Sequence, residues 1–346
     1  MRVLNLSLDK NVLKEGSLVQ RRLISLAGKH GTDTEEVNVT VLMPGKRDEQ
    51  KRISPHLVIH AVGGFKILQF FKMWRKGKGI LKHHPLSISP STERERQEYN
   101  LITVQDAYFV GLIGFLLARK FNIPLEIQVH GLEQYSGLRK IVANFLLPRA
   151  TKIRVVSERL QRELISNFQF PISKFYILPV YTQVETALRS VKKGLPVPFT
   201  FLTVGRLVPV KNIALQIRAF ARLVREVPHV RLVIVGSGAE RSNLQFLISN
   251  FQLKDKVILA GRQENLERYY QEADAFLLTS DSEGYGVVVT EAAAYKLPII
   301  MTNVGLAGEF IKHDESGIII PVGNEDELFG AMKELVEKPE LRLRLG

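Results

Sequence analysis

Two acidic side chains flank a glycine-bearing turn near residue 285. The segment Asp281-Ser-Glu-Gly-Tyr-Gly-Val-Val-Val-Thr-Glu291 follows the apolar run Ala275–Leu278, and its pattern predicts a helix from Gly286 to Tyr295. Its glycines permit a tight turn, and the first amide groups of a helix favour a phosphate. Glu283 and Glu291 are therefore candidate ligand-binding residues. Taken singly, each is explained as well by a capping acid or a solvated helix residue.

A second loop holds two cations. Gly205-Arg206-Leu-Val-Pro-Val-Lys211-Asn212 follows the apolar stretch Phe199–Val204 and precedes a helical pattern over Ile213–Glu226. The guanidinium of Arg206 offers a planar fork and the ammonium of Lys211 a point charge, which together suit a diphosphate. The alternative is an ordinary surface loop that contains an Arg and a Lys.

The stretch Val235-Gly-Ser-Gly238 has two glycines of a dinucleotide fingerprint, but Arg241 stands where the third glycine is required. We therefore reject NAD binding and expect these glycines to form a turn.

Three further candidates lie after predicted strands of the first half. His130 follows Leu125–Val129, Asp106 follows Leu101–Val104, and Gly16 comes soon after the first strand. A lone histidine is more often structural than functional. His130 is a candidate because ligands of doubly wound folds bind at the carboxyl ends of strands.

Short apolar runs alternate with helical patterns along the whole chain. Within Ile213–Glu226, for example, Ile213, Ile217, Phe220 and Val224 form one apolar stripe. Repeated strand–helix–strand order predicts an α/β fold with parallel sheets covered by helices on both faces. The predicted strands are Val3–Leu8, Val39–Met43, Leu57–Ala61, Leu101–Val104, Leu125–Val129, Ile153–Val156, Phe175–Leu178, Phe199–Val204, Arg231–Val235, Lys256–Ala260, Ala275–Leu278, Pro298–Met301 and Gly317–Ile320.

The length of 346 residues favours two domains. The strand series restarts near Phe199, after the basic stretch Arg189–Pro198, which we interpret as a linker. This places an N-terminal domain at 1–190 and a C-terminal domain at 198–346.

The composition of the chain excludes several kinds of chemistry. Hydrophobic residues make up 45% of the chain and charged residues 24%, as in a globular protein. Cysteine is absent, which excludes disulfides, thiolate catalysis and Cys-ligated zinc. No apolar run approaches the ~18–20 residues of a membrane span, and Met1–Leu8 has no signal-peptide pattern. A cytoplasmic location is therefore expected.

The positive charge belongs to the first half. Residues 1–194 hold 31 Lys and Arg against 16 Asp and Glu, and residues 195–346 hold 17 against 19. Such an asymmetry predicts an anionic partner for the first half, such as a lipid surface or a lipid-phosphate acceptor. Nucleic acid is not favoured, because aromatic residues are not interleaved with the cations as in a nucleic-acid platform.

The stretch Phe65–Lys82 is both basic and apolar and holds the only tryptophan, Trp74. It fits a helix lying in an anionic membrane interface. The alternative is an amphipathic helix packed on the sheet with a solvated basic end.

Several of these segments together resemble glycosyltransferase family 4, which consists of retaining enzymes with the GT-B fold. Gly205–Asn212 resembles the family's "GRL…KN" segment and Glu283–Glu291 its E-x7-E motif. Less specific likenesses follow over most of residues 100–335: Thr103–Asp106, Gln128–Gly131, Val155–Arg159, Val235–Gly238, Ala260–Gly261, and Pro298–Asn303 with Gly305 and Glu309.

The resemblance implies two Rossmann-like domains that face each other across a cleft and a role for each matching residue. Arg206 and Lys211 would bind the donor's phosphates, Glu291 the ribose, and Glu283 the transferred sugar. His130 would lie near the sugar or acceptor. The implied catalytic residues are Glu283, His130, Arg206 and Lys211, and the implied donor-binding residues are Gly16, Gly205, Arg206, Lys211, Arg262, Glu283, Gly284, Tyr285, Gly286, Val287 and Glu291.

The implied reaction moves a hexose-type sugar from a UDP- or GDP-sugar to a hydroxyl of a glycan or lipid-linked acceptor, in cell-envelope polysaccharide or glycolipid synthesis. No cofactor or metal is expected. The enzyme would be cytoplasmic or peripheral on the inner face of the membrane. Family members usually continue with a helix or two that cross back to the first domain, whereas this sequence stops at Gly346. A truncated C-terminus is therefore expected.

Three alternatives stay open. One is another GT-B enzyme, such as a phosphorylase or an epimerase. The second is a truncated or degenerate relative that binds a nucleotide-sugar or a membrane without turnover. The third, a metal-dependent transferase, rests only on the acids of Asp281-Ser-Glu. The two cations and the two carboxylates favour the transferase without a metal.

Overall fold

The computed structural model describes residues 1–27, 37–82, 99–131, 137–168, 171–180 and 198–346. They form two compact units: Met1–Val156 with Gln161–Leu178, and Ser157–Leu160 with Pro179–Gly346. The predicted linker lies outside the described residues except for Pro198. The short segment Ser157–Leu160 falls inside the predicted first domain but groups with the second unit.

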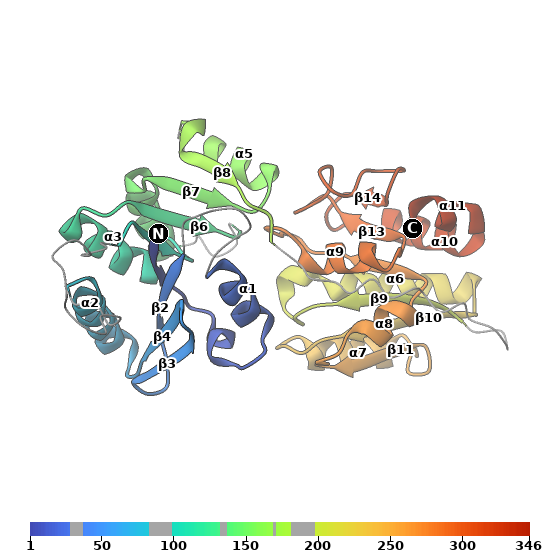
Figure 1. Ribbon diagram of the computed structural model, residues 1–346. Helices are drawn as coiled ribbons and strands as arrows, with labels where there is room; N and C mark the ends of the chain where they lie inside the picture. The colour runs from blue at the N-terminus through green and yellow to red at the C-terminus, as the bar shows by residue number, and fades with distance from the viewer. Residues whose placement is uncertain (28–36, 83–98, 132–136, 169–170, 181–197) are drawn as a thin grey trace. The chain divides into compact units, whose positions relative to one another are not determined.

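The N-terminal unit is built on a sheet of eight strands (Figure 1). Their order is β3 (Glu49–Ser54), β4 (Leu57–Val62), β2 (Asn38–Pro44), β1 (Arg2–Leu6), β5 (Leu101–Val104), β6 (Leu125–Val129), β7 (Lys152–Val155) and β8 (Phe175–Ile177). Every neighbouring pair is parallel except β3 with β4. The central strands are buried along their length, as parallel strands covered on both faces must be.

Strand β3 was not predicted from the sequence. Its residues, Glu-Gln-Lys-Arg-Ile-Ser, are mostly polar, and they lie at the edge of the sheet with mainly exposed or half-exposed side chains. An edge strand needs no apolar face, so hydrophobic patterning does not detect it.

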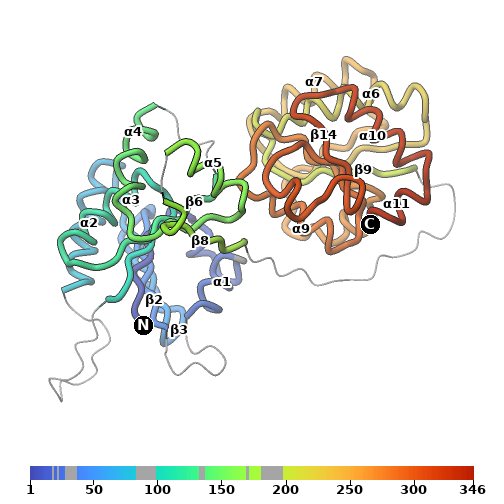
Figure 2. Tube along the Cα trace, turned by 90° about the horizontal axis from the view of Figure 1, so that it is seen from above, coloured from blue at the N-terminus to red at the C-terminus, as the bar shows by residue number. Residues whose placement is uncertain are grey.

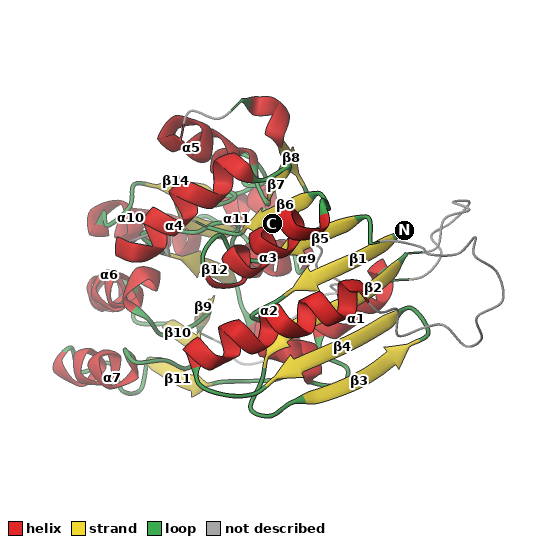
Figure 3. Cartoon of the chain, turned by 90° about the vertical axis from the view of Figure 1, so that its left-hand side faces the viewer, coloured by secondary structure: helices red, strands yellow, loops and turns green. Residues whose placement is uncertain are grey.

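The helical elements of this unit are η1 (Lys10–Leu13), α1 (Leu18–Leu26), α2 (Lys66–Lys82), α3 (Phe109–Phe121), α4 (Gly137–Leu146), η2 (Leu147–Arg149), α5 (Glu158–Phe168) and η3 (Ile172–Lys174). Helices α2, α3 and α4 are neighbours, and α3 lies between the other two (Figures 2 and 3). Gly114 allows α3 to approach β5 closely, because a Cβ there would lie 2.4 Å from a methyl group of Val104.

The C-terminal unit has six parallel strands in the order β11 (Val257–Gly261), β10 (Val230–Val235), β9 (Phe199–Val204), β12 (Ala275–Leu278), β13 (Ile299–Thr302) and β14 (Ile318–Ile320). Numbered within the unit, this is the order 3-2-1-4-5-6 of a dinucleotide-binding Rossmann domain. Its helical elements are η4 (Pro209–Lys211), α6 (Ile213–Glu226), α7 (Arg241–Asn250), α8 (Glu267–Glu272), α9 (Val287–Ala294), α10 (Glu325–Glu337) and α11 (Pro339–Leu345).

Two apolar clusters hold this unit together, and α6 belongs to one of them. The predicted stripe of α6 is confirmed: Ile213, Ile217 and Phe220 are buried and Val224 packs against the same cluster. Helix α10 packs beside α6 and is capped by Asn324, whose side chain accepts a hydrogen bond from the Glu327 amide at 3.1 Å. A cap of this kind stabilises a helix by about 1 kcal/mol.

The order of the strands determines where a ligand can bind. β9 and β12 are neighbours in the sheet, but the chain leaves β9 toward one edge and β12 toward the other. Ligands of open α/β sheets bind at such a switch point, outside the carboxyl ends of the strands. The loops that leave β9 and β12 carry the candidate cations and acids found in the sequence.

Candidate functional site

The loops after β9 and β12 meet through an ion pair. The ammonium of Lys211 contacts Oε1 of Glu283, and the two side chains are only 18% and 12% exposed. Ser280 donates a second hydrogen bond to the same carboxylate oxygen at 2.8 Å. A cation and an acid that were predicted as candidates from two separate loops, 72 residues apart in the sequence, thus contact each other.

Further hydrogen bonds fix the two loops against each other. The Asp281 amide donates to the Val210 carbonyl at 2.8 Å, and the Asn212 side-chain amide donates to Asp281 at 2.9 Å. The Thr279 hydroxyl contacts the carbonyl oxygens of Lys211 and Asn212 at 3.2 and 3.1 Å. Because the loops are held in this way, the charges they carry are preorganised.

A buried amide lies beneath the ion pair. Gln216 of α6 is 1% exposed, and its Nε2 contacts the hydroxyls of Thr279 at 2.9 Å and Thr203 at 3.3 Å. The Thr203 hydroxyl donates to the carbonyl of Leu277 at 2.9 Å. Sequence reasoning missed Gln216, and the one available signal is a polar residue inside the apolar pattern of a buried helix.

Arg206 lies on the same loop, directly after Gly205. It is exposed, and in the part of the chain that the structure describes its guanidinium has no ion pair. Its charge is therefore available to an anion that reaches the loop.

The glycines after β10 explain how this loop is seated. Gly236 has a φ of +150°, and a Cβ there would lie 1.8 Å from the Gly205 carbonyl oxygen. A Cβ on Gly238 would lie 2.2 Å from the carbonyl oxygen of Leu207. The turn predicted for Val235–Gly238 therefore has a packing role, since it lets the backbone contact the Arg206 loop closely.

The turn into α9 supplies amide groups beside the ion pair. Gly286 adopts a φ of +89° and caps the helix, which begins at Val287 and ends at Ala294. The predicted helix was one residue longer at each end, because Gly286 and Tyr295 are caps. The first N–H groups of a helix have no partner within it and carry partial positive charge. Gly284 is buried and Tyr285 half-buried on this turn.

Glu291 lies inside α9 and is held by a tyrosine. The Tyr270 hydroxyl donates to its Oε2 at 2.7 Å, and the Tyr270 ring stacks on Tyr295 with centroids 5.3 Å apart. Burial, and then the negative charge of Glu291, raises the pKa of Tyr270 far above its usual range. The phenol therefore stays a donor and orients the carboxylate. No local pattern in the sequence distinguishes Tyr270 as a candidate.

A third group of contacts lies around Glu309. Its carboxylate accepts hydrogen bonds from the Glu158 amide at 3.0 Å and from the Arg159 amide. The Arg159 guanidinium donates to Asn303 at its carbonyl and side-chain oxygens, both at 2.6 Å, and to the Ala307 carbonyl at 2.8 Å. Landmarks that looked separate in the sequence form one network, which explains why Ser157–Leu160 groups with the second unit.

The remaining predicted residues lie elsewhere. Arg262 is exposed just after β11. His130 follows β6 in the N-terminal unit and is exposed. Gly16 lies between η1 and α1 rather than directly after β1, with a φ of +69°. Asp106 is buried and caps the start of α3, where its carboxylate accepts a hydrogen bond from the Tyr108 amide at 2.8 Å.

Among the described residues, no group of three or more histidine, aspartate or glutamate side chains is placed to hold a metal ion. In the same part of the chain, no helix is both long and apolar enough to cross a membrane.

Comparison with known proteins agrees with the geometry. Residues 189–346 match the family described as "Glycosyl transferases group 1". The chain is 32% identical over 209 residues to N-acetylgalactosamine-N,N'-diacetylbacillosaminyl-diphospho-undecaprenol 4-alpha-N-acetylgalactosaminyltransferase of Campylobacter jejuni, an alignment covering 60% of this chain and 56% of that protein. It is 25% identical over 277 residues to alpha-monoglucosyldiacylglycerol synthase of Streptococcus pneumoniae, covering 71% and 61%. The chain thus spans little more than half the length of these relatives.

Two solved structures resemble this chain in fold over its whole length. Sucrose-phosphate synthase from Thermosynechococcus elongatus matches with a TM-score of 0.80 and 19% identity, covering 100% of this chain and 92% of that one. Anabaena Alr3699/HepE in complex with UDP matches with a TM-score of 0.75 and 18% identity over the same shares.

Residues 189–346 therefore match the group 1 glycosyltransferase family, and the chain has the GT-B fold with a mainly parallel α/β sheet in each unit. This confirms the predicted family resemblance and fold class at that level.

Proposed function

We propose that the protein is a retaining hexosyltransferase of glycosyltransferase family 4. It would move a sugar from a nucleotide-diphosphate donor to a hydroxyl of a lipid-linked or glycan acceptor. One observation carries the proposal: Lys211, Glu283 and the start of α9 lie together at the β9–β12 switch point, next to an exposed Arg206. Cations, helix amides and a carboxylate in one place suit a sugar diphosphate.

The charge that develops in the reaction explains the cations. As the bond from C1 to the leaving phosphate oxygen breaks, negative charge accumulates on the diphosphate and positive charge on the sugar. Arg206, Lys211 and the α9 amides would stabilise the diphosphate, which is the usual role of preorganised donors. The acceptor oxygen would bond to C1 on the same face, and its proton would pass to the departing phosphate oxygen.

Lys211 and Glu283 would exchange partners when the donor binds. In the structure they neutralise each other. A diphosphate that approached the α9 amides would compete with Glu283 for the ammonium of Lys211. The freed carboxylate would then accept hydrogen bonds from the hydroxyls of the sugar. Glu291, oriented by Tyr270, would accept hydrogen bonds from the ribose hydroxyls.

The names of the relatives favour envelope substrates. The Campylobacter relative is named for a diphospho-undecaprenol substrate and the Streptococcus relative for a diacylglycerol product. We extend this class of lipid-linked acceptor to the present chain, with the enzyme in the cytoplasm or on the inner face of the membrane. The neighbour solved with UDP makes UDP-sugars the first donors to test, and GDP-sugars the second.

A thermal-shift panel of nucleotide-diphosphate sugars on the full chain tests the proposal. A ligand at a hundredfold excess over its dissociation constant stabilises the fold by ~2.7 kcal/mol. The donor that gives the largest shift is then incubated with membrane lipid extract, with and without EDTA.

We expect release of the nucleoside diphosphate, formation of a glycosylated lipid, and no loss of rate with EDTA. Stabilisation without turnover would support the non-catalytic alternative, and phosphorolysis of a glycan would support a phosphorylase. The absence of any stabilising nucleotide would contradict the assignment of the site.

A further inference from the structure

The N-terminal unit exposes apolar side chains on two helices. At the start of α2, Phe65 is 90% exposed, Ile67 78% and Phe71 59%; on α4, Leu138 is 77% exposed and Ile141 65%. Single exposed apolar residues are common on protein surfaces, but clusters of large ones mark interaction sites. Because α3 lies between these two helices (Figures 2 and 3), both clusters belong to one helical layer.

The same layer is strongly basic. Helices α2, α3 and α4 contain ten lysine and arginine residues and no aspartate or glutamate. On α2, Lys66 and Lys72 alternate with the exposed apolar residues, and on α4 Arg139 and Lys140 do so. This combination matches a helix that inserts apolar side chains between anionic headgroups and keeps its cations at their level.

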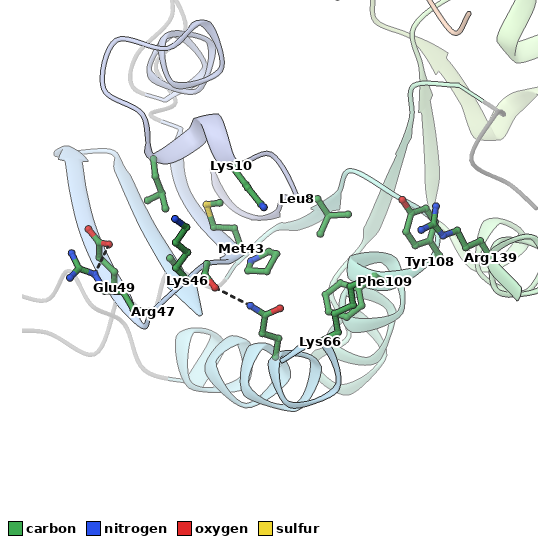
Figure 4. Close-up of a pocket in the computed structure, with 15 residues that line it drawn as sticks. Leu8, Lys10, Met43, Lys46, Arg47, Glu49, Lys66, Tyr108, Phe109 and Arg139 are labelled. Atoms are coloured by element: carbon green, nitrogen blue, oxygen red, sulfur yellow. Dashed lines mark hydrogen bonds and ion pairs between the residues drawn. The ribbon is translucent and has the colours of Figure 1, made fainter. Parts of the chain in front are cut away.

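A pocket of about 1000 Å³ opens beside this layer, wholly within the N-terminal unit (Figure 4). Lys10 and Lys46 line it next to the apolar side chains of Leu8 and Met43. Arg47 is turned toward Glu49, with which it pairs at 3.7 Å. Lys10 and Lys46 lie after β1 and β2, at the carboxyl ends of strands, where this class of sheet binds its ligands. The lining thus combines cations with apolar surface.

The lining of the pocket and the exposed apolar residues both include residues at the starts of α2 and α4. Lys66 and Arg139 line the pocket, and each is a sequence neighbour of an exposed apolar residue, Ile67 and Leu138. Within the layer, the Arg139 guanidinium lies 4.9 Å from the centre of the Tyr108 ring, and Tyr108 also lines the pocket. A ligand anchored in a membrane that touched α2 and α4 would therefore have its headgroup at the mouth of the pocket.

We propose that α2 and α4 dock the N-terminal unit on an anionic phospholipid membrane, and that the pocket receives the phosphate-bearing headgroup of a membrane lipid. That this lipid is the sugar acceptor rests on the proposed function; the docking and the phosphate binding do not. A protein partner fits less well, because a layer with ten cations and no acid lacks the mixed polar rim of a protein interface.

Vesicle sedimentation tests the docking. The wild-type chain, an Ile67→Ser/Phe71→Ser variant and a Phe246→Ser control are mixed with phosphatidylcholine vesicles, with or without phosphatidylglycerol. Phe246 is 67% exposed on α7 of the other unit. Insertion of Ile67 and Phe71 into the membrane would bury two apolar side chains. Without them we expect the double variant to bind roughly tenfold more weakly or worse.

The control should bind as the wild type does, and only vesicles with phosphatidylglycerol should bind strongly. Wild-type protein that stays in solution with both kinds of vesicle would overturn the docking proposal. Equal loss in the control and the double variant would also overturn it, since the binding would then not depend on α2.

Calorimetric titration tests the pocket. The probes are farnesyl diphosphate, farnesol and inorganic diphosphate, each added below its micellar concentration with the nucleotide of the donor kept saturating. We expect farnesyl diphosphate to bind most tightly, and a Lys10→Gln/Lys46→Gln variant to lose about tenfold or more of that affinity. The same variant should bind the nucleotide normally.

Equal affinity for inorganic and farnesyl diphosphate would show a free-phosphate site and overturn the lipid assignment. An unchanged affinity in the variant would overturn the role of the pocket. Because nucleotide binding to the wild type and the variant is measured in a separate titration, a failure here is distinguished from a failure of the proposed transferase function.

Discussion

Both units have loops beyond the carboxyl ends of their parallel strands, but the side chains on these loops differ between the two units. After β9 and β12, the charged and polar groups are partly buried and are tied to one another through Lys211, Glu283, Ser280 and Asp281. After β1 and β2, a wide pocket is lined by Lys10 and Lys46 among apolar side chains. The groups of the C-terminal site are held in one geometry by these hydrogen bonds, whereas the N-terminal pocket offers cations beside apolar area.

The charges of the two halves follow the same division. The first 194 residues carry an excess of 15 positive charges, while the rest carry an excess of two negative charges. Stabilising a diphosphate leaving group requires a few hydrogen-bond donors in fixed positions. An anionic surface is attracted by the summed charge of many cations, whose positions need not be fixed. This difference agrees with the two proposals, in which the C-terminal cluster would bind the reacting diphosphate and the N-terminal layer an anionic membrane.

We expect the largest effect on turnover from Lys211→Ala, a change in the C-terminal cluster. The variant removes a cation from the leaving diphosphate, and loss of one such group lowers turnover by roughly a hundredfold or more. It also leaves Glu283 partly buried without its cation, so the melting temperature should fall. Rates and melting curves of the variant are compared with those of Lys254→Ala, an exposed lysine of the same unit.

A Lys211→Met/Glu283→Gln variant separates these two effects. It should recover thermal stability but not turnover, because the buried charge is gone while the phosphate contact is still missing. Near-normal turnover in either Lys211 variant would contradict the assigned role.

A smaller, structural effect is expected for Gly236→Ala. The new Cβ would clash with the Gly205 carbonyl, at a φ that residues with side chains rarely adopt. Overpacking and backbone strain of this kind cost about 1–3 kcal/mol each. The melting temperature and the nucleotide affinity should both fall, because the Arg206 loop is displaced.

Gly330→Ala is the matched control. Gly330 lies in α10, where an added Cβ would have no neighbouring atom within 4 Å. Glycine in a helix is destabilising by about 0.5–1 kcal/mol relative to alanine. The control should therefore gain slight stability and keep its nucleotide affinity. Equal melting temperatures for the two variants would contradict the packing role of Gly236.

The smallest effect is a pH dependence confined to the N-terminal unit. His60 of β4 is 3% exposed, and burial, followed by the positive charge of Lys76, lowers its pKa to about 4. The unfolded chain has an ordinary histidine pKa of about 6.5 and binds the proton first as the pH falls. His60 therefore lowers the stability of the fold progressively between pH 6.5 and 4, and not above that range.

Melting curves of the wild type and of His60→Leu over this pH range test the effect. The variant should lose less stability on acidification, while nucleotide affinity at the C-terminal site should be the same in both proteins. Parallel pH profiles of the two proteins would contradict the buried, neutral state of His60.

The positions of most strands in both units could be predicted from the sequence, because parallel strands are continuously apolar. Four predicted strands, including Phe199–Val204 and Ala275–Leu278, match the observed strands at both ends, and the others differ by one or two residues at one or both ends. Within the site, the residues that could be predicted are charged residues that follow such strands. Lys211 and Glu283 are examples.

The polar partners could not be predicted in the same way. Gln216, Ser280 and Tyr270 are ordinary residues in their local patterns. Their roles come from contacts made in the folded chain, such as that of Gln216 with Thr279, 63 residues away. The polar strand β3 was missed because it lies at an edge. The contacts of Arg159 with Asn303 and Ala307 depend on tertiary structure that no local pattern encodes.

In the proposed function, the loop after β9 binds the diphosphate of a nucleotide. The most direct measurement is calorimetric titration of UDP and UMP, or of GDP and GMP if those stabilise the protein more, into the wild type and Arg206→Ala. Arg206 is exposed, so the variant should fold normally. We predict that the wild type prefers the diphosphate to the monophosphate roughly tenfold or more, and that Arg206→Ala loses most of this preference. An unchanged ratio of the two affinities in the variant would contradict the account.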